Sequence, residues 1–290
     1  MEIRIREILL VCNVNRDERE ELLRLSRELG FQGWLQQYDH ESREQPRTLV
    51  EQEAKATSCK EVQLVTIPRL LQTESYARAV ISRGINASGK RVELLVRTRL
   101  ARQDIFLRSP PPRMAFFVHE SILRAITGDR VIMAEQLHHL LRYSVRPNVE
   151  LRVIPISAGA HVAQTGSFTL LEFADFTPIV HLEGELSAAF LEQPHQISAY
   201  QRLLSTSADS ALSRDETKKM ITTLATEYTA ATECLAEVGS SMAEIAANLR
   251  RTIESGAVPP KAAARMAAFL EDLAIRASGE ALAPETADPE

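Results

Sequence analysis

Short apolar stretches separated by turn residues occupy the centre of the chain. The three clearest cover residues 149–157, 166–173 and 178–183, and each is rich in β-branched or aromatic residues. Each also has the length of a strand and is bounded by turn residues. The pattern therefore predicts three successive strands that form the sheet on which the helices pack. Further strands are predicted at 61–67 and 114–118, where apolar residues alternate or run together.

Segments with helical periodicity lie before, between and after these strands in the sequence. The predicted helices cover residues 48–58, 73–80, 91–107, 119–126, 133–142, 194–204 and 261–277, and a long helix begins after Ser213. Ser213 and Glu216 have the spacing of a capping box, and Thr73 is predicted to cap the helix that begins there. Phe31, Trp34 and Tyr38 also follow one another at helical spacing, and they predict an aromatic contact with the main body or a stacking surface for a ligand. The predicted fold class is α+β, with a small mixed sheet packed by helices.

The long helix carries a heptad seam. Its apolar positions alternate in steps of three and four, and they are Ile221, Leu224, Tyr228, Ala231, Leu235, Val238, Met242, Ile245 and Leu249. A seam of this regularity is typical of a coiled coil or a helical hairpin. Gly239 lies in its middle, so a break that turns the helix into an antiparallel pair stays open. In either case the seam needs a partner surface, and a homodimer through these residues is one prediction.

Turn and linker residues divide the chain into four segments. Residues 1–47 are predicted to form a helical segment and a linker, residues 48–212 an α+β domain, residues 213–277 a helical extension, and residues 278–290 a disordered tail. No apolar run approaches the roughly 20 residues that span a bilayer. The N-terminus also lacks the apolar region of a secretory signal. The chain is therefore expected in the cytoplasm.

Composition and charge limit the function classes. The formal net charge is −5 and the pI is near 5.9. This balance argues against a broad nucleic-acid-binding face, because affinity for phosphate comes mainly from clustered Lys and Arg. No phosphate-binding glycine loop and no nucleophile elbow occurs in the sequence. No cofactor is therefore expected.

Cysteine and histidine spacing gives no metal motif. Cys12, Cys59 and Cys234 contain no Cys-x-x-Cys pair, so they predict neither a zinc site nor a disulfide framework. The histidines considered as ligands are His119, His138, His139, His161 and His181. They show no His-x-x-x-His or His-Glu-x-x-His spacing, so no metal site is expected.

Polar residues at two places form the candidate ligand site. The predicted ligand residues are Arg99, Arg102, Gln103, His161, Gln164 and Phe168. The first three share one turn of a predicted helix, where planar guanidinium groups are suited to grip a carboxylate or phosphate. The alternative is an ordinary salt-bridged or exposed helix face. The other three lie in or just after a small-residue loop at 157–165. An effector that enters between helix and loop is expected to shift the packing of sheet and helices.

Catalysis is the rival prediction. Glu183 and Glu185 lie on the same side of a strand end by the period of two, and a carboxylate pair there suits acid–base chemistry. With Arg99 or Arg102 nearby, this Glu-x-Glu string resembles elements of ADP-ribosyltransferases. Such a transferase-like enzyme would use Glu183, Glu185 and His161. Solvated carboxylates are the ordinary alternative.

The order of several short motifs resembles one family. The motifs are Ile-Pro-Arg-Leu-Leu-Gln-Thr-Glu-Ser-Tyr-Ala-Arg-Ala from Ile67, Arg-Thr-Arg-Leu-Ala-Arg-Gln from Arg97, His-Glu-Ser-Ile-Leu from His119, Gln-Leu from Gln136, Asn-Val-Glu-Leu-Arg-Val-Ile-Pro from Asn148, Gly-Ser-Phe from Gly166 and Ala-Leu-Ser-Arg-Asp-Glu from Ala211. Over residues 22–223 they resemble the C-terminal domain of unknown function that follows an XRE-type helix-turn-helix in actinomycete transcriptional regulators. The resemblance implies a domain that binds an effector or a partner protein, and it leaves the chemistry open.

The N-terminal segment differs from such regulators. Only residues 1–14 precede the helix predicted near Asn15, where the regulators carry a DNA-binding domain. These residues match at most the last helix of that domain and supply no recognition helix, so the chain is expected not to read DNA sequence by itself. A misassigned start is the alternative. The overall prediction is a ligand- or partner-binding module of transcriptional control that works with another DNA-binding chain or its own oligomer. A purely structural dimerisation protein is the third alternative.

Overall fold

The chain folds into two compact units. The structure is a computed structural model that describes residues 34–37, 47–84, 89–159, 166–183, 187–254 and 260–278. The sheet unit comprises the described residues of 1–65, 104–119 and 148–211, and the helical unit comprises those of 66–103, 120–147 and 212–290. The predicted α+β class, a mixed sheet packed by helices, is confirmed. Residues 48–212, which the sequence predicts to form one domain, contribute to both units.

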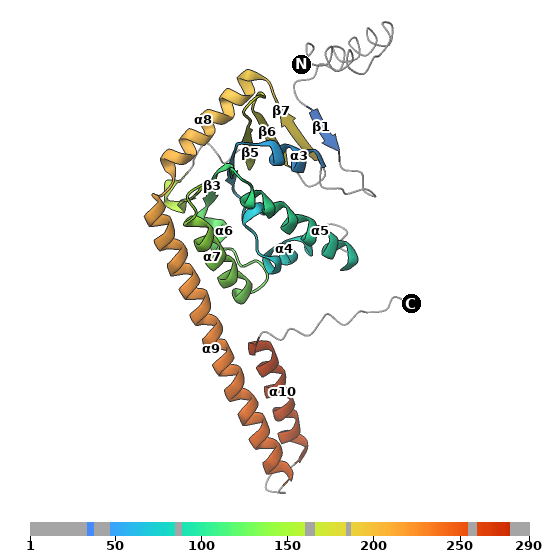
Figure 1. Cartoon of the computed structure of the whole chain (residues 1–290). Helices are drawn as coiled ribbons and strands as arrows, with labels where there is room; N and C mark the ends of the chain where they lie inside the picture. Colours follow the sequence, from blue (N-terminus) through green and yellow to red (C-terminus); the bar gives the residue numbers. More distant parts are fainter. Residues whose placement is uncertain are drawn as a thin grey trace. The chain divides into compact units, whose positions relative to one another are not determined.

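A mixed sheet of seven strands, counted over the described residues, forms the sheet unit (Figure 1). In spatial order the strands are β1 (Trp34–Gln37), β7 (Ser187–Leu191), β6 (Ile179–Glu183), β5 (Phe168–Glu172), β2 (Ser58–Gln63), β3 (Arg113–His119) and β4 (Val149–Ile154). Strands β2, β3 and β4 run parallel, and the other neighbours are antiparallel. Parallel strands need long crossover connections. Residues 66–103 and 120–147 supply them, which explains why the two units alternate along the chain.

The strand predictions hold for most of the sheet but miss its order. The three central stretches form β4, β5 and β6, yet β4 lies at the sheet edge beside β3 whereas β5 pairs with β2. The strand predicted at 61–67 is shifted, because β2 ends at Gln63. Strand β7 has no counterpart in the prediction. The helical interpretation of Phe31 to Tyr38 is wrong over residues 34–37, which form β1 and pair with β7. Pairing at a sheet edge overrides helical spacing there.

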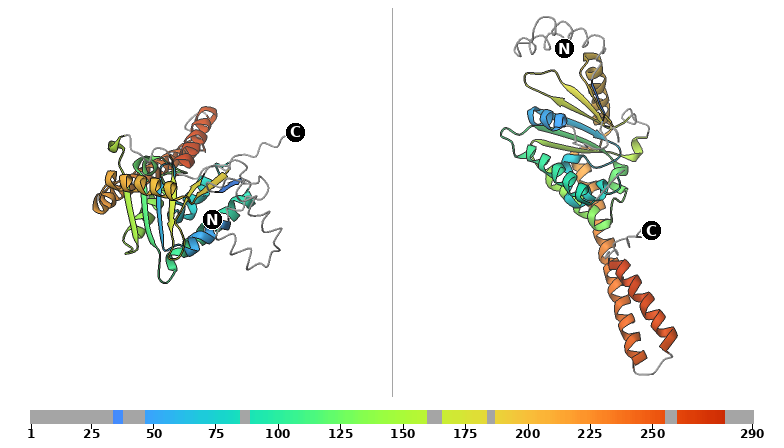
Figure 2. Two further views of the ribbon diagram at one scale, coloured as in Figure 1. Left: turned by 90° about the horizontal axis from the view of Figure 1, so that it is seen from above. Right: turned by 90° about the vertical axis from the view of Figure 1, so that its right-hand side faces the viewer.

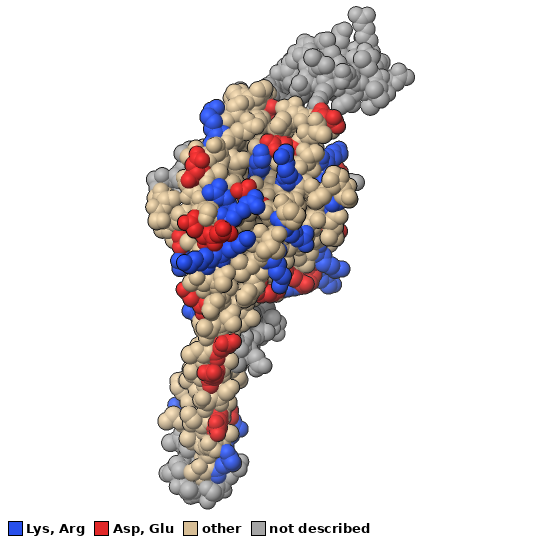
Figure 3. All heavy atoms as spheres, turned by 60° about the vertical axis from the view of Figure 1, so that its left-hand side comes forward, with Lys and Arg blue, Asp and Glu red and all other residues tan. Residues whose placement is uncertain are grey.

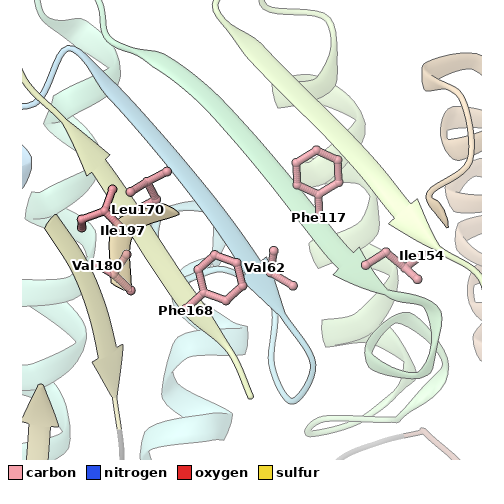
Figure 4. Close-up of a cluster of buried hydrophobic side chains, with 7 residues drawn as sticks. All are labelled: Val62, Phe117, Ile154, Phe168, Leu170, Val180 and Ile197. Carbon is pink, nitrogen blue, oxygen red and sulfur yellow. The ribbon is translucent and has the colours of Figure 1, made fainter. Parts of the chain in front are cut away.

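Helix α8 (Pro194–Ser210) covers one face of the sheet. Their shared core contains Val62, Phe117, Ile154, Phe168, Leu170, Val180 and Ile197 (Figure 4). Val62 and Phe168 are register partners on β2 and β5, so alternation places both on the face that α8 covers. Tyr200 of α8 packs edge-on against Phe168, with ring centroids 4.9 Å apart. Helix α3 (Arg47–Lys55) belongs to the same unit, and Arg108 Nη1 donates to the Ala56 carbonyl just after its end at 3.1 Å.

Helices build the second unit. They are α4 (Glu74–Ile81), α5 (Gly89–Ala101), α6 (Glu120–Arg124), α7 (Arg130–Ser144), α9 (Arg214–Glu254) and α10 (Pro260–Ser278), and the 3-10 turn η1 (Arg69–Leu71) precedes α4. Helix α9 packs along α7 and then side by side with α10, which returns in the opposite direction (Figures 1 and 2). No helix in the described part of the chain is long and apolar enough to cross a membrane.

The start and the middle of α9 test two predictions. The capping box is confirmed, because the Ser213 N–H donates to Glu216 Oε2 at 2.9 Å and the Glu216 N–H donates to Ser213 Oγ at 3.3 Å. The break at Gly239 does not form, since α9 is continuous from Arg214 to Glu254. The antiparallel pair is instead made by α9 and α10. The helix predicted at 91–107 ends earlier, at Ala101, and continues as the 3-10 helix η2 (Arg102–Leu107).

Candidate functional site

Gln72 is the centre of a buried polar cluster in the helical unit. It follows η1 and is fully buried, and its Nε2 donates to the Ile67 carbonyl at 2.7 Å. Arg99 Nη1 on α5 donates to Gln72 Oε1 at 2.7 Å. Gln103 Nε2 donates to the Gln72 carbonyl, also at 2.7 Å. Two of the predicted ligand residues therefore hold the polypeptide itself in place. Arg102, the third on this turn, is buried as well.

Gln136 of α7 holds the same turn through both ends of its amide. Its Oε1 accepts from the Thr73 N–H at 2.7 Å, and its Nε2 donates to the Leu71 carbonyl at 2.7 Å. Thr73 caps α4 as predicted, because its side chain accepts from the Tyr76 N–H at 3.3 Å. These bonds supply partners to buried backbone groups that would otherwise be unsatisfied. The polar residues of the motif that begins at Ile67 thus have a structural role.

Positive charge in this cluster still allows chemistry with anions. A guanidinium stays protonated in proteins, so Arg99 and Arg102 place charge in the interior of the helical unit. A carboxylate or phosphate that reached them would meet charge-assisted donors. Binding by Arg99, Arg102 and Gln103 stays a prediction, and a ligand there would have to compete with Gln72.

The remaining predicted site residues are distributed differently. Phe168 is buried in the core of the sheet unit, and Glu183 is exposed at the end of β6. His161, Gln164 and Glu185 lie outside the described residues. The loop site and the carboxylate pair therefore stay predictions. Among the described residues, no group of three or more His, Cys, Asp or Glu side chains is placed to hold a metal ion.

A polar row that was not predicted from the sequence crosses the sheet. Glu61, Thr169 and His181 are register partners on β2, β5 and β6, so they share one face. Both ionisable members are buried. Glu61 Oε1 accepts from Gln63 Nε2 at 2.6 Å, and the His181 ring packs on Phe190 with centroids 4.7 Å apart. No local signal could reveal this row, because it depends on the register of strands about a hundred residues apart.

His139 on α7 has a strongly lowered pKa. Burial of the ring lowers the pKa most, and the positive charges of Arg142 and Arg146 lower it further, to about 4 from 6.5. Arg142 Nη2 lies 3.0 Å from His139 Nδ1. Since an arginine only donates, Nδ1 accepts and the proton of the neutral ring is on Nε2. The folded chain therefore favours the neutral imidazole.

The folded chain is expected to lose stability at His139 as the pH falls from 6.5 to about 4. In this window the unfolded chain binds a proton at His139 that the folded chain does not, so acid favours unfolding, whereas above 6.5 the contribution is complete. Partial solvent screening limits the effect to roughly 1 kcal/mol. Urea unfolding of His139→Gln at several pH values should show a weaker pH dependence, with the exposed neighbour His138→Gln as control. An unchanged pH dependence in His139→Gln would contradict this assignment.

The predicted heptad seam divides in the middle of α9. Ile221 and Leu224 are buried where this helix packs against α7. The Tyr228 hydroxyl lies 3.1 Å from the Leu123 carbonyl oxygen and 3.0 Å from that of Arg124, which attaches the helix to α6. The seam residues Leu235, Val238 and Ile245 are exposed. The part of the seam that is open to another molecule therefore begins at Leu235.

Small residues line the contact between α9 and α10. Gly239, Ala246, Ala267 and Ala274 are buried and spaced seven residues apart on each helix. Small side chains let two helices approach closely. Each of the four is preceded in sequence by a larger apolar residue, namely Val238, Ile245, Met266 and Leu273. The α9–α10 contact therefore buries the small residue of each pair and leaves the larger one exposed or half-buried.

The larger residues lie on one face of the hairpin. A helix turns by about 100° per residue, so each of them lies to the same side of the contact line on its own helix. An approximate two-fold axis, perpendicular to the plane that contains both helix axes, relates the two antiparallel helices. Rotation about this axis keeps each face of the plane on its own side. The larger residues of α9 and of α10 therefore lie on the same face. Val238, Ile245 and Met266 are exposed, whereas Leu273 is half-buried. Phe269 follows Met266 by three residues, so it is exposed on the same side of α10. We call Val238, Ile245, Met266 and Phe269 the hairpin face. Their exposed fractions are 41%, 49%, 56% and 59%.

The α10 half of this face was not predicted. Met266, Phe269 and Leu273 follow the i, i+3, i+7 spacing of an apolar helix stripe, which was a usable signal. Alanine dominates this helix and made it resemble a simple helical extension.

A family comparison covers most of the two units. The family described as "Domain of unknown function (DUF5753)" matches residues 46–223, which is more than half of the chain. The chain belongs to the DUF5753 family. Membership confirms the predicted relationship to a domain of unknown function and assigns it neither a ligand nor a reaction. The DUF5753 match includes the Gln72 cluster and the sheet from β2 to β7, and it ends within α9, before the hairpin face.

Other comparisons add little. No curated protein matches the chain. One matching solved structure is titled as that of TrmBL2, an archaeal chromatin protein with a novel mode of DNA binding. The two chains are 12% identical, the match covers 72% of this chain and 64% of the TrmBL2 chain, and the TM-score is 0.28. The chain thus spans less than two thirds of that structure, and at this score the likeness carries no argument.

Proposed function

We propose that the chain is a protein-binding module of transcriptional control, and that the hairpin face binds its partner. The observation that carries the proposal is the exposure of four large apolar side chains on one face of α9 and α10. Contiguous apolar surface that stays uncovered on a folded protein marks an interaction site. The transcriptional setting rests on the motif resemblance to XRE-type regulators.

Charge and contacts favour a protein partner over the alternatives. Figure 3 shows Lys and Arg interspersed with Asp and Glu on the visible face. A phosphate-binding surface would instead carry clustered positive charge. Arg99 and Gln103, the best candidates for gripping a small anion, already bond Gln72. No arrangement among the described residues favours catalysis over binding.

Deletion and complementation in the natural host test this function. We expect deletion of the gene to change a defined set of transcripts several-fold, and the original chain to restore them. A double variant, Val238→Glu with Ile245→Glu, should fail to restore them, because two carboxylates on the apolar face oppose partner binding. Leu94→Glu on α5 is the matched control, since Leu94 is also an exposed apolar residue of the helical unit. Circular dichroism of each variant checks that its helices are intact.

Two results would overturn the proposal. One is a transcript profile that deletion leaves unchanged. The other is site-selective binding of the purified chain to duplex DNA at physiological salt in a gel-shift experiment, because the module is proposed to act through a protein. Weak retardation that is equal for all DNA sequences supports the proposal that the chain does not recognise DNA sequence.

A further inference from the structure

We infer that the partner of the hairpin face is a second copy of this chain, and that two α9–α10 hairpins form an intermolecular four-helix bundle. The inference rests on the proposed function and names the partner that the hairpin face binds. It uses only residues of the helical unit, and its experiment measures mass rather than gene expression, so the two can fail separately.

A repeated three-residue pattern makes the hairpin face match itself. Each unit of the pattern is a charged, a large apolar and a small residue. The four units are Glu237-Val238-Gly239, Glu244-Ile245-Ala246, Arg265-Met266-Ala267 and Asp272-Leu273-Ala274. The small residue is buried at the contact of α9 with α10. The apolar residue lies on the side of the hairpin face, where Val238, Ile245 and Met266 are exposed and Leu273 is half-buried. Because both helices repeat the pattern every seven residues, their faces have the spacing that knobs-into-holes packing requires.

The symmetry of the hairpin suits a two-fold dimer. An isologous interface uses the same patch on both copies, so the patch must be complementary to itself. Val238 and Ile245 on one helix are matched by Met266 and Phe269 on the other, which gives the two halves of the face similar width and chemistry. Two such faces can therefore cover each other without leaving either half open.

Partly covered side chains define where a second hairpin would rest. Met242, Leu249, Leu270 and Leu273 are half-buried along the contact of α9 with α10. They form an apolar line between the exposed residues of the two helices. A second copy that lies on this line buries the half-buried residues and the exposed residues at once. Apolar contact is then concentrated at the centre of the interface.

Charges at the rim indicate how the copies are oriented. The first residue of each pattern lies one step further round the helix, at the outer edge of the hairpin face. Glu237 and Glu244 are exposed on α9, and Arg265 is exposed on α10, whereas Asp272 is half-buried. A two-fold axis parallel to the helices places α9 of one copy over α10 of the other. The acidic edge then meets the edge that carries Arg265, which favours this arrangement over one that pairs the acidic edges.

Sedimentation of the full chain tests the dimer. Equilibrium runs from roughly 1 to 100 µM span the affinity expected of a small helical interface. The expected mass is twice the 32.4 kDa of one chain at the upper concentrations. Both Val238→Glu with Ile245→Glu and Met266→Glu with Phe269→Glu should sediment as monomers. Leu94→Glu should keep the dimer, and unchanged circular dichroism shows that the variants remain folded.

A charge exchange tests the orientation. Glu244→Arg and Arg265→Glu should each weaken the dimer about threefold to tenfold, and the combined variant should recover most of the affinity. Recovery supports the arrangement in which α9 of one copy packs on α10 of the other. Additive weakening overturns this arrangement.

The outcomes separate the dimer from the proposed function. A chain that stays monomeric at the highest concentration, or a dimer that both apolar variants leave intact, overturns the second copy as partner. If deletion of the gene still changes transcripts while the chain is monomeric, the proposed function stands with a different protein on the hairpin face. If the chain dimerises through this face but transcripts do not depend on it, the dimer stands and the proposed function fails.

Discussion

Gln136→Leu is expected to destabilise the helical unit by about 4 kcal/mol. Leucine is similar in size to glutamine, so the change removes hydrogen bonds without opening a large cavity. The Thr73 N–H and the Leu71 carbonyl, both bonded at 2.7 Å to the Gln136 amide, lose their buried partner. Each unsatisfied buried group costs about 1–3 kcal/mol, and the Gln136 side chain is fully buried.

Two measurements check the Gln136 prediction. Urea unfolding followed by circular dichroism gives the change in free energy, and hydrogen exchange at the Thr73 amide reports the local loss independently of the sheet unit. Glu135→Leu at the exposed neighbouring position is the control, and it should change the free energy by less than about 0.5 kcal/mol. A Gln136 variant as stable as this control would mean that the η1 turn does not depend on the amide.

Phe168→Ala is expected to cost about 3–5 kcal/mol in the sheet unit. Phe168 is 3% exposed, belongs to the core cluster between sheet and α8, and packs edge-on against Tyr200. Removal of the ring leaves a cavity and ends that aromatic contact. Phe168→Leu should cost clearly less, because it fills most of the space.

The matched control for Phe168 is Phe176, which is 54% exposed. Phe176→Ala should change the free energy of unfolding by less than about 1 kcal/mol. The comparison separates the ligand role that was predicted for Phe168 from the core role that the structure gives it. A residue at the rim of a ligand site would tolerate truncation as Phe176 does, and such a result would contradict its place in the core.

The Gln72 cluster gives the family motif a structural explanation. The motif that begins at Ile67 includes the run Leu71-Gln72-Thr73, for which no binding role was predicted. In the structure the backbone and side chains of this run are satisfied by Arg99 and Gln136 from other helices. The DUF5753 region thus resembles a scaffold at this point, and the hairpin beyond residue 223 carries the exposed surface.

The sequence by itself determined the features that depend on near neighbours. Apolar periodicity located most strands and helices, and the caps at Thr73 and Ser213 followed from side chains that bond the backbone three residues away. Arg99 on α5 and Gln103 on η2 were identified as candidates, but their partner Gln72 was not.

Only the tertiary structure decided which segments meet. It placed β1 and β7 in the sheet, aligned Glu61 with Thr169 and His181, and brought Gln136 to the η1 turn more than sixty residues away. It also decided that α7 covers the start of the α9 seam, whereas Leu235, Val238 and Ile245 further along the helix stay exposed. Hydrogen bonds within a helix and the alternation of a strand are local, and a sequence pattern records them. Pairing register and burial arise from packing between distant segments, which no short pattern specifies.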